Sequence, residues 1–137
     1  MQTREELSAR TAQYHASAID WASDLEFFKV ETVFFHRLLD DYFIRLSAPE
    51  YVQKLRIVER ELLEMENDRY ELDKLLLEHL NAIELTIMNA VSEKNEDLEV
   101  MHIRLGYLMT ELMRKFRLTK KALFAVVEEL LNDDMLF

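Results

Sequence analysis

The sequence is almost free of the residues that interrupt helices. Its 137 residues include one glycine, Gly106, and one proline, Pro49. Average usage would place about ten glycines and seven prolines in a chain of this length. Sheets with tight turns and loop-rich sites depend on such residues, so the sequence predicts an all-α protein.

The chain has the size and composition of one folded domain. Half of its residues are hydrophobic and 32% are charged, a balance typical of globular rather than disordered proteins. A chain of this length can bury a working hydrophobic core without disulfides or metal. We therefore expect a single helical-bundle domain over residues 1–137.

Large apolar side chains recur every seven residues along the first third of the chain, and smaller side chains alternate with them. The large ones are Leu7, Tyr14, Trp21, Phe28, Phe35 and Tyr42; the smaller ones are Thr11, Ala18, Leu25, Thr32, Leu39 and Leu46. This spacing is typical of helices that pack at a shallow, left-handed angle. We expect these positions, the first seam, to be buried lengthwise against two later helices.

Two polar segments separate three predicted helices. Ser47, Pro49 and Glu50 have the pattern of a helix N-terminus, with the serine as cap and the proline in the first turn. The run from Ser92 to Asp97 contains no apolar residue. We predict an antiparallel up-down bundle with helices over about 4–46, 49–92 and 97–133. The alternative is a four-helix bundle with a break near residue 67 or 118.

The second and third predicted helices also carry apolar seams. In the second helix these positions are Leu55, Val58, Leu62, Met65, Leu72, Leu76, His79, Ile83 and Ile87. In the third helix they are Leu98, Leu105, Met109, Leu112, Phe116, Leu123, Leu130 and Phe137. Their spacing of three and four residues predicts that each helix buries one face in the bundle.

A second set of apolar residues lies outside these seams and predicts an oligomer interface. The set is Phe27, Val30, Val33, Phe34, Leu63, Tyr70, Phe124, Val127 and Leu131. Exposed apolar patches beyond a few hundred Å² mark interaction sites in soluble proteins. We expect a homo-oligomer, most simply a two-fold dimer. The alternative is that a fourth helical segment or a wider bundle interior covers these residues within one chain.

The histidines are the main candidates for binding a metal, because the chain has no cysteine. Folding the predicted helices at their turns places His15, His79 and Glu111 at nearly one level. Two histidines and a carboxylate can bind zinc or ferrous iron. The alternative to a metal ligand is a histidine that lies in the core and forms a hydrogen bond with a neighbour. The same alternative applies to His102, which belongs to the single Glu-x-x-His motif. We therefore predict no metal or other cofactor.

The common catalytic constellations are missing from the sequence. With one glycine there is no Gly-rich phosphate loop, and no serine has a glycine-rich turn to build a nucleophile and oxyanion site. The 17 basic and 27 acidic residues give a net charge of −10, which repels nucleic acid and anionic membranes. We expect no enzyme activity, no nucleic-acid partner and no membrane association. The N-terminal sequence lacks a signal-peptide pattern, so we expect a cytoplasmic location.

Five basic residues of the third predicted helix form one cluster: Arg114, Lys115, Arg117, Lys120 and Lys121. Such a cluster could bind an acidic partner or phosphate. The simpler interpretation is pairing with acidic residues at the same level of the other two helices, including Asp68.

The segment from Trp21 to Glu31, continuing through Phe34, Phe35, Leu38 and Leu39, resembles a pattern in uncharacterised bacterial helical proteins. In those proteins Trp-x-Ser-Glu-Leu-x-Phe opens a long helix, and here Asp24 replaces the usual glutamate. The match covers about one-fifth of the chain. The resemblance implies a helical bundle and carries no activity.

These observations predict a cytoplasmic, non-enzymatic bundle that acts as a protein interaction or scaffold module and self-associates, with an unidentified protein partner. The competing hypothesis is a bundle that binds a metal or small ligand near His15, His79 and Glu111.

Overall fold

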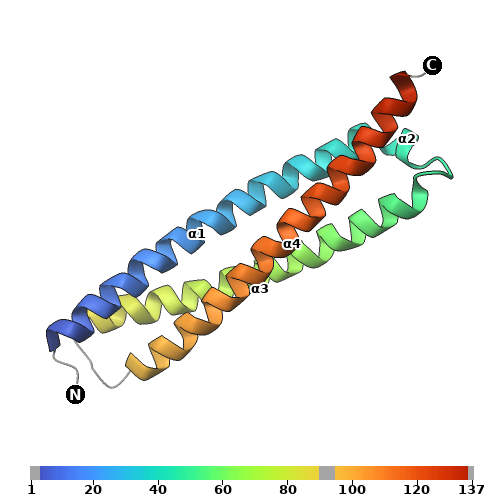
Figure 1. The fold of residues 1–137 in the computed structure, drawn as a ribbon. Coiled ribbons are helices and arrows are strands. Elements are labelled where there is room, and N and C mark those ends of the chain that lie inside the picture. The colour runs from blue at the N-terminus through green and yellow to red at the C-terminus, as the bar shows by residue number, and fades with distance from the viewer. Residues whose placement is uncertain (1–3, 90–94, 136–137) are drawn as a thin grey trace. The chain divides into compact units, whose positions relative to one another are not determined.

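The computed structural model describes residues 4–89 and 95–135. These residues form helices and turns, with no β-strand among them. The elements are α1 (Arg4–Asp41), α2 (Phe43–Leu46), α3 (Val52–Asn89) and α4 (Asn95–Met135) (Figure 1). The prediction of an all-α bundle with three long helices is therefore confirmed.

The long helices are continuous where the alternative arrangement would have broken them. α3 runs through Asn67, and α4 runs through Gly106 and Leu118. The fourth helix is the four-residue α2, which we predicted to be the end of the first helix. Tyr42 interrupts the helix with φ −105° and ψ 8°, but its amide still donates to Leu38 and its carbonyl still accepts from Leu46.

The predicted helix start at Ser47 is wrong. Ser47 is the C-cap of α2, and its hydroxyl donates a 2.7 Å hydrogen bond back to the carbonyl of Phe43. Pro49 lies in the following turn, and α3 begins at Val52, three residues later than predicted. A serine hydroxyl can bond the carbonyl four residues before it or an amide after it, and the sequence pattern does not distinguish the two.

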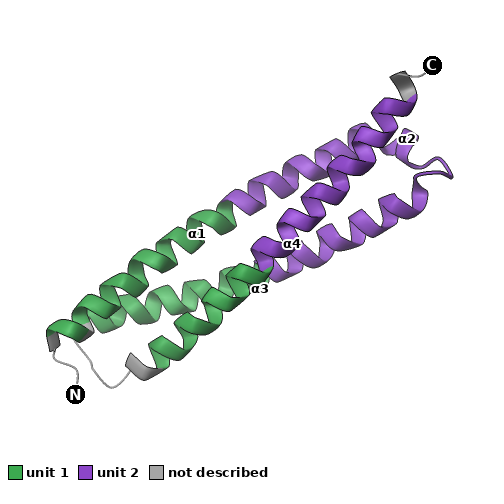
Figure 2. Cartoon of the chain, viewed as in Figure 1, with its two compact units in different colours: residues 1–26, 70–111 green, residues 27–69, 112–137 purple. Residues whose placement is uncertain are grey.

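The chain divides into two compact units, shown in Figure 2. Unit 1 comprises residues 1–26 and 70–111, and unit 2 comprises residues 27–69 and 112–137. Each of the three long helices contributes a segment to both units. The single domain expected from the sequence stays a prediction.

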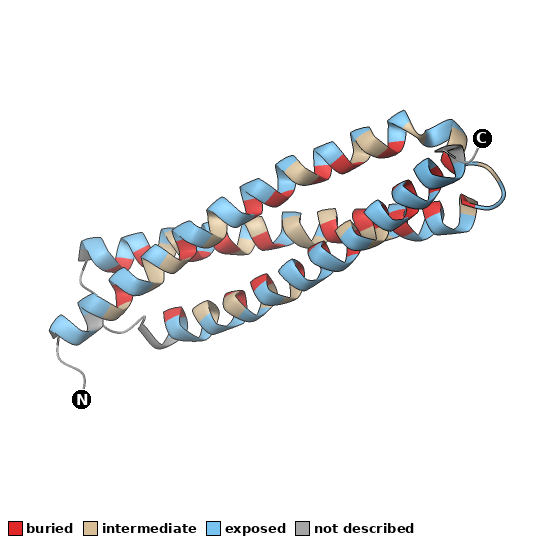
Figure 3. Ribbon diagram, turned by 45° about the horizontal axis from the view of Figure 1, so that its top comes forward, coloured by how far each residue is buried: buried red, intermediate tan, exposed pale blue. Residues whose placement is uncertain are grey.

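In unit 1, one apolar face from each helix segment forms the core. Its buried residues include Ala18 and Leu25 of α1, Leu72, Leu76 and Ile83 of α3, and Leu98, Leu105 and Met109 of α4. Figure 3 shows the buried residues, in red, along one side of each long helix. The spacing of three and four residues therefore predicted the buried face of each helix correctly.

In unit 2, aromatic side chains fill the centre of the core. The ring centroid of Phe116 lies 4.5 Å from that of Phe28 and 5.7 Å from that of Phe35. Phe35 also meets Phe124 edge to face, with 6.0 Å between the centroids. Phe28, Phe35 and Phe116 are buried, so this cluster joins α1 to α4 within the unit.

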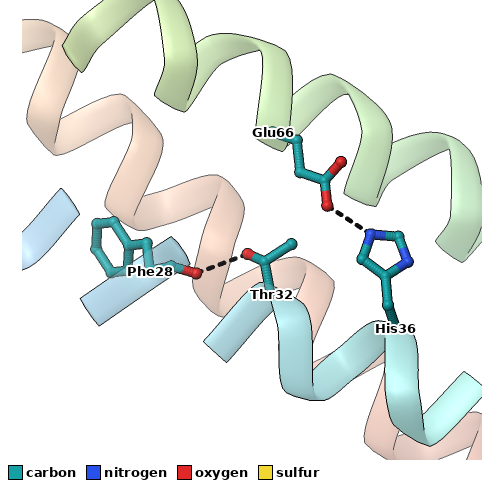
Figure 4. Close-up of polar contacts among 4 residues, drawn as sticks. All are labelled: Phe28, Thr32, His36 and Glu66. Atoms are coloured by element: carbon teal, nitrogen blue, oxygen red, sulfur yellow. Dashed lines mark hydrogen bonds and ion pairs between the residues drawn. The ribbon is translucent and has the colours of Figure 1, made fainter. Parts of the chain in front are cut away.

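Two polar side chains of α1 make hydrogen bonds at the edge of the unit 2 core. Figure 4 shows the Thr32 hydroxyl donating a 2.7 Å bond to the carbonyl of Phe28, one turn earlier in α1. On the next turn, Nε2 of His36 lies 2.5 Å from a carboxylate oxygen of Glu66 in α3. The buried threonine thus satisfies its polar group inside its own helix, and the half-exposed histidine reaches across to α3.

The three predicted seams agree with the observed burial at nearly every described position. In the first seam, the small members are buried and Tyr14, Trp21 and Tyr42 are partly exposed. Ile87 of the second helix was predicted to be buried but is 53% exposed, two residues before α3 ends at Asn89. The side chain of Leu7, and Phe137, lie outside the described residues.

Within residues 4–89 and 95–135, no helix combines the length and apolar character needed to span a membrane.

Candidate functional site

Two histidines of unit 1, one from α3 and one from α4, contact each other. Nε2 of His79 in α3 lies 3.0 Å from Nδ1 of His102 in α4. His79 is 2% exposed, and its Nδ1 is buried with no hydrogen-bond partner among the described residues. One imidazole must donate and the other must accept in such a bond, so the two rings cannot both carry a second proton while it persists.

Aromatic rings of α1 enclose His102. Its ring centroid lies 4.3 Å from that of Tyr14 and 4.5 Å from that of Trp21, and both pairs are stacked. Trp21 also covers Gly106, one turn further along α4, where an added Cβ would lie 3.5 Å from the indole ring. The first seam therefore supplies the aromatic wall of the histidine pair.

Burial determines the titration of these groups. Burial, followed by the neighbouring His102, lowers the pKa of His79 from 6.5 to about 4. Burial also lowers the pKa of His102, and burial followed by the negative charge of Glu99 raises the pKa of Tyr14. The two histidines are therefore neutral near pH 7.

The structure does not bring His15, His79 and Glu111 together as predicted. His79 faces His102, which precedes Glu111 by nine residues in the chain, while His15 lies 4.0 Å from Glu84. In the described part of the chain, no group of three or more metal-ligating side chains is close enough to hold an ion. The two histidines form a neutral hydrogen-bonded contact between α3 and α4.

The sequence pattern places both histidines of this pair on buried helix faces. The predicted turn between the second and third helices gave a register that did not bring them together. His79 and His102 stand on opposite sides of the polar segment, and both occupy inward positions of their helices. Pairing His79 with Glu111 required the helices to slide by about nine residues, which is about 13 Å along a helix axis. The register between two helices therefore decided the site.

The predicted interface residues of α1 are on the surface of unit 2. Phe27, Val30, Val33 and Phe34 are each between 52% and 60% exposed, while Phe28 and Phe35 beside them are buried. Leu63 of α3 and Phe124 and Leu131 of α4, in the same unit, are also exposed. Tyr70 is exposed as well but belongs to unit 1.

Val127 was wrongly assigned to this exposed set. It is 7% exposed, and it lies with Leu123 and Leu130 on the buried side of α4. Val127 is four residues after Leu123 and three before Leu130, so it shares their face, whereas Phe124 and Leu131 lie beside that face.

Further exposed apolar residues in unit 1 were missed from the sequence. Val100, Ile103 and Tyr107 of α4 are each at least 66% exposed. Their spacing of three and four residues places them on the side of α4 opposite to Leu98 and Leu105. That spacing could have identified this exposed apolar side from the sequence.

The basic cluster of α4 makes interhelical ion pairs, as the sequence predicted, and Asp68 is one of the expected partners whereas Glu31 is not. Nζ of Lys115 lies 2.6 Å from a carboxylate oxygen of Asp68, and Nζ of Lys120 lies 3.4 Å from one of Glu31. Further toward the C-terminus, Lys54 pairs with Glu129 at 2.7 Å. These pairs are partly exposed, so each contributes about 0–1 kcal/mol and mainly aligns the helices of unit 2.

Comparison with known proteins gives no match: no family model, curated protein or solved structure corresponds to this chain.

Proposed function

We propose that this protein is a non-enzymatic interaction module that binds protein surfaces and, in the first place, another copy of itself. The supporting observation is the exposed apolar side of α1 in unit 2. Aromatic side chains present about 150–250 Å² each, so the half-exposed Phe27 and Phe34 alone place about 200 Å² of apolar surface in solvent.

On α1, exposed apolar residues lie directly beside buried ones. The exposed apolar side is therefore additional to the core, and this supports a binding role for it. Phe34 and Phe35 are adjacent in sequence, yet one is 52% exposed and the other is fully buried. Val30 and Val33 extend the exposed side along α1, and Phe124 and Leu131 continue it on α4. A contiguous patch of a few hundred Å² is the size at which interaction sites occur.

The proposal includes the cytoplasmic location and the unidentified protein partner expected from the sequence. Fractionation of host cells tests the location. Affinity purification from the same host at low salt tests for a partner, because low salt preserves weak charged contacts.

The decisive experiment is the mass of the purified protein in solution. Sedimentation velocity from micromolar to several hundred micromolar should show a species of twice the chain mass of 16.4 kDa, with a concentration-dependent fraction. A monomer over the whole range would contradict self-association.

A further inference from the structure

The exposed edge of α4 in unit 2 carries charges in a self-complementary order. Its residues are spaced by four and three positions, which keeps them on one side of the helix. In chain order they are Arg117, Lys121, Phe124, Glu128 and Leu131, and all five are exposed. The basic residues precede Phe124 and the acidic residue follows it. We refer to these five residues as the α4 stripe.

A second stripe with identical spacing borders it on α1. Its residues are Phe27, Glu31, Phe34, Leu38 and Asp41. Lys120 pairs with Glu31 and lies over the ring of Phe124, with 5.8 Å between Nζ and the ring centroid. The two stripes therefore form one continuous surface of unit 2, the α1/α4 face.

We propose that a second copy of this chain packs on the α1/α4 face, with α4 antiparallel to its symmetry mate and the two-fold axis passing beside Phe124 and Ala125. This inference rests on the proposed function and specifies its surface. Lys121 and Glu128 lie equally far from the midpoint between Phe124 and Ala125, about 5 Å along the helix on either side. The two-fold axis then places Lys121 of each copy against Glu128 of the other.

Charge favours this arrangement over other contacts between copies. Copies of a chain with a net charge of −10 repel each other, so a surface where opposite charges meet is favoured for association. A two-fold contact pairs a patch with itself, and the α4 stripe meets this condition because its basic and acidic ends exchange places. Ala125, which is small and exposed, allows the two helices to approach closely at the axis.

The size of the face is sufficient for a specific but weak dimer. The five positions of the α4 stripe span about 21 Å of helix, and α1 beside it doubles the width. Such a footprint corresponds to roughly 500–600 Å² of accessible surface on each copy, at the lower end of specific interfaces. We therefore expect a dimer that dissociates in the micromolar range or above.

Reversal of the two charges tests the arrangement directly. Lys121→Glu and Glu128→Lys should each weaken the dimer about tenfold or more, because a single reversal places like charges at both symmetry-related contacts. The double variant Lys121→Glu/Glu128→Lys restores opposite charges and should return the dimerisation constant to within about threefold of the wild type. Within one chain these residues are seven positions apart, about 10 Å along the helix, so they do not pair with each other. Reversing their charges therefore breaks no ion pair between them inside the monomer.

Two further variants keep the test independent of folding. Phe34→Glu places a charge on the α1 side of the α1/α4 face and should abolish the dimer. Ile103→Glu places a charge on an exposed apolar position of unit 1 and should leave the dimer intact. Circular dichroism and thermal unfolding should show that both variants remain helical and folded.

The outcomes separate the inference from the proposed function. If the wild-type protein is monomeric, both fail. If the wild type is a dimer that all single variants preserve, or that the double variant fails to restore, self-association stands and the α1/α4 face is wrong. If Ile103→Glu disrupts the dimer while Phe34→Glu does not, the interface lies in unit 1.

Discussion

Nε2 of His79 lies 3.0 Å from Nδ1 of His102, in a contact that joins α3 to α4 and is enclosed by the rings of Tyr14 and Trp21. Both imidazoles have lowered pKa values because they are buried. The pair is therefore stable as two neutral rings, and this makes the stability of the fold dependent on pH.

We expect the free energy of unfolding to decrease as the pH falls from about 6.5 to 4. Above pH 6.5 His79 is neutral in both states. Below it the unfolded chain binds a proton that the folded chain binds only near its pKa of about 4. At the acid end of this window the free energy of unfolding is then lower by on the order of 3 kcal/mol.

Urea unfolding of the wild type and of His79→Gln at several pH values from 7.5 to 4 measures this effect. Carboxylates also titrate near the lower limit, so the difference between the two proteins is the informative quantity. The variant should lose less stability across the window than the wild type. Equal losses in both proteins would show that His79 does not contribute.

The adjacent residues Phe34 and Phe35 should respond very differently to truncation. Phe35 is fully buried against Phe116 and Phe124, so Phe35→Ala should cost about 3–5 kcal/mol. Phe34 is 52% exposed, so Phe34→Ala should cost less than about 1 kcal/mol in the monomer. Denaturant unfolding at low protein concentration measures both, and comparable losses would contradict the assigned orientation of α1.

Replacing Gly106 by alanine should stabilise the protein. A Cβ at this position would lie 3.5 Å and 3.7 Å from two carbons of the Trp21 ring, which is ordinary van der Waals contact. Glycine inside a helix costs about 0.5–1 kcal/mol relative to alanine, so Gly106→Ala should gain about that much. Thermal unfolding measures the gain.

A larger side chain at the same position provides the control. Gly106→Leu should instead destabilise the fold by about 1–3 kcal/mol, because its additional carbons meet the indole ring. If both variants were stabilising, Trp21 could not be packed over Gly106 as described.

Tyr51 should lose its hydroxyl proton at a higher pH than an ordinary tyrosine. Its hydroxyl donates a hydrogen bond to the carboxylate of Asp133, which together with burial raises the pKa of Tyr51 from 10.0 to about 12. The stabilisation is present below pH 10 and is lost as the pH rises toward 12, because the unfolded chain releases this proton first.

Absorbance at 295 nm, where tyrosinate absorbs, follows this ionisation. Asp133→Asn removes the negative charge and should move the late component to lower pH, and Tyr51→Phe should remove it altogether. A titration curve that Asp133→Asn leaves unchanged would contradict the contact.

Local sequence was sufficient to predict the helices and their inward faces. The scarcity of glycine and proline favours helix throughout, and the spacing of three, four and seven residues identifies the buried side. For this reason Ala18, Leu25 and Phe35 were placed in the core correctly. These features depend on backbone geometry within one helix, which neighbouring residues determine.

The tertiary structure decided how the helices align and where each face ends. His79 meets His102 instead of Glu111 because the register between α3 and α4 differs from the one that the predicted turn implied. Val127 is buried and Phe124 is exposed because the core covers α4 on the side of Leu123 and Leu130. Register and the width of the buried face follow from how side chains on separate helices fit together, and a repeat within one helix does not encode that fit.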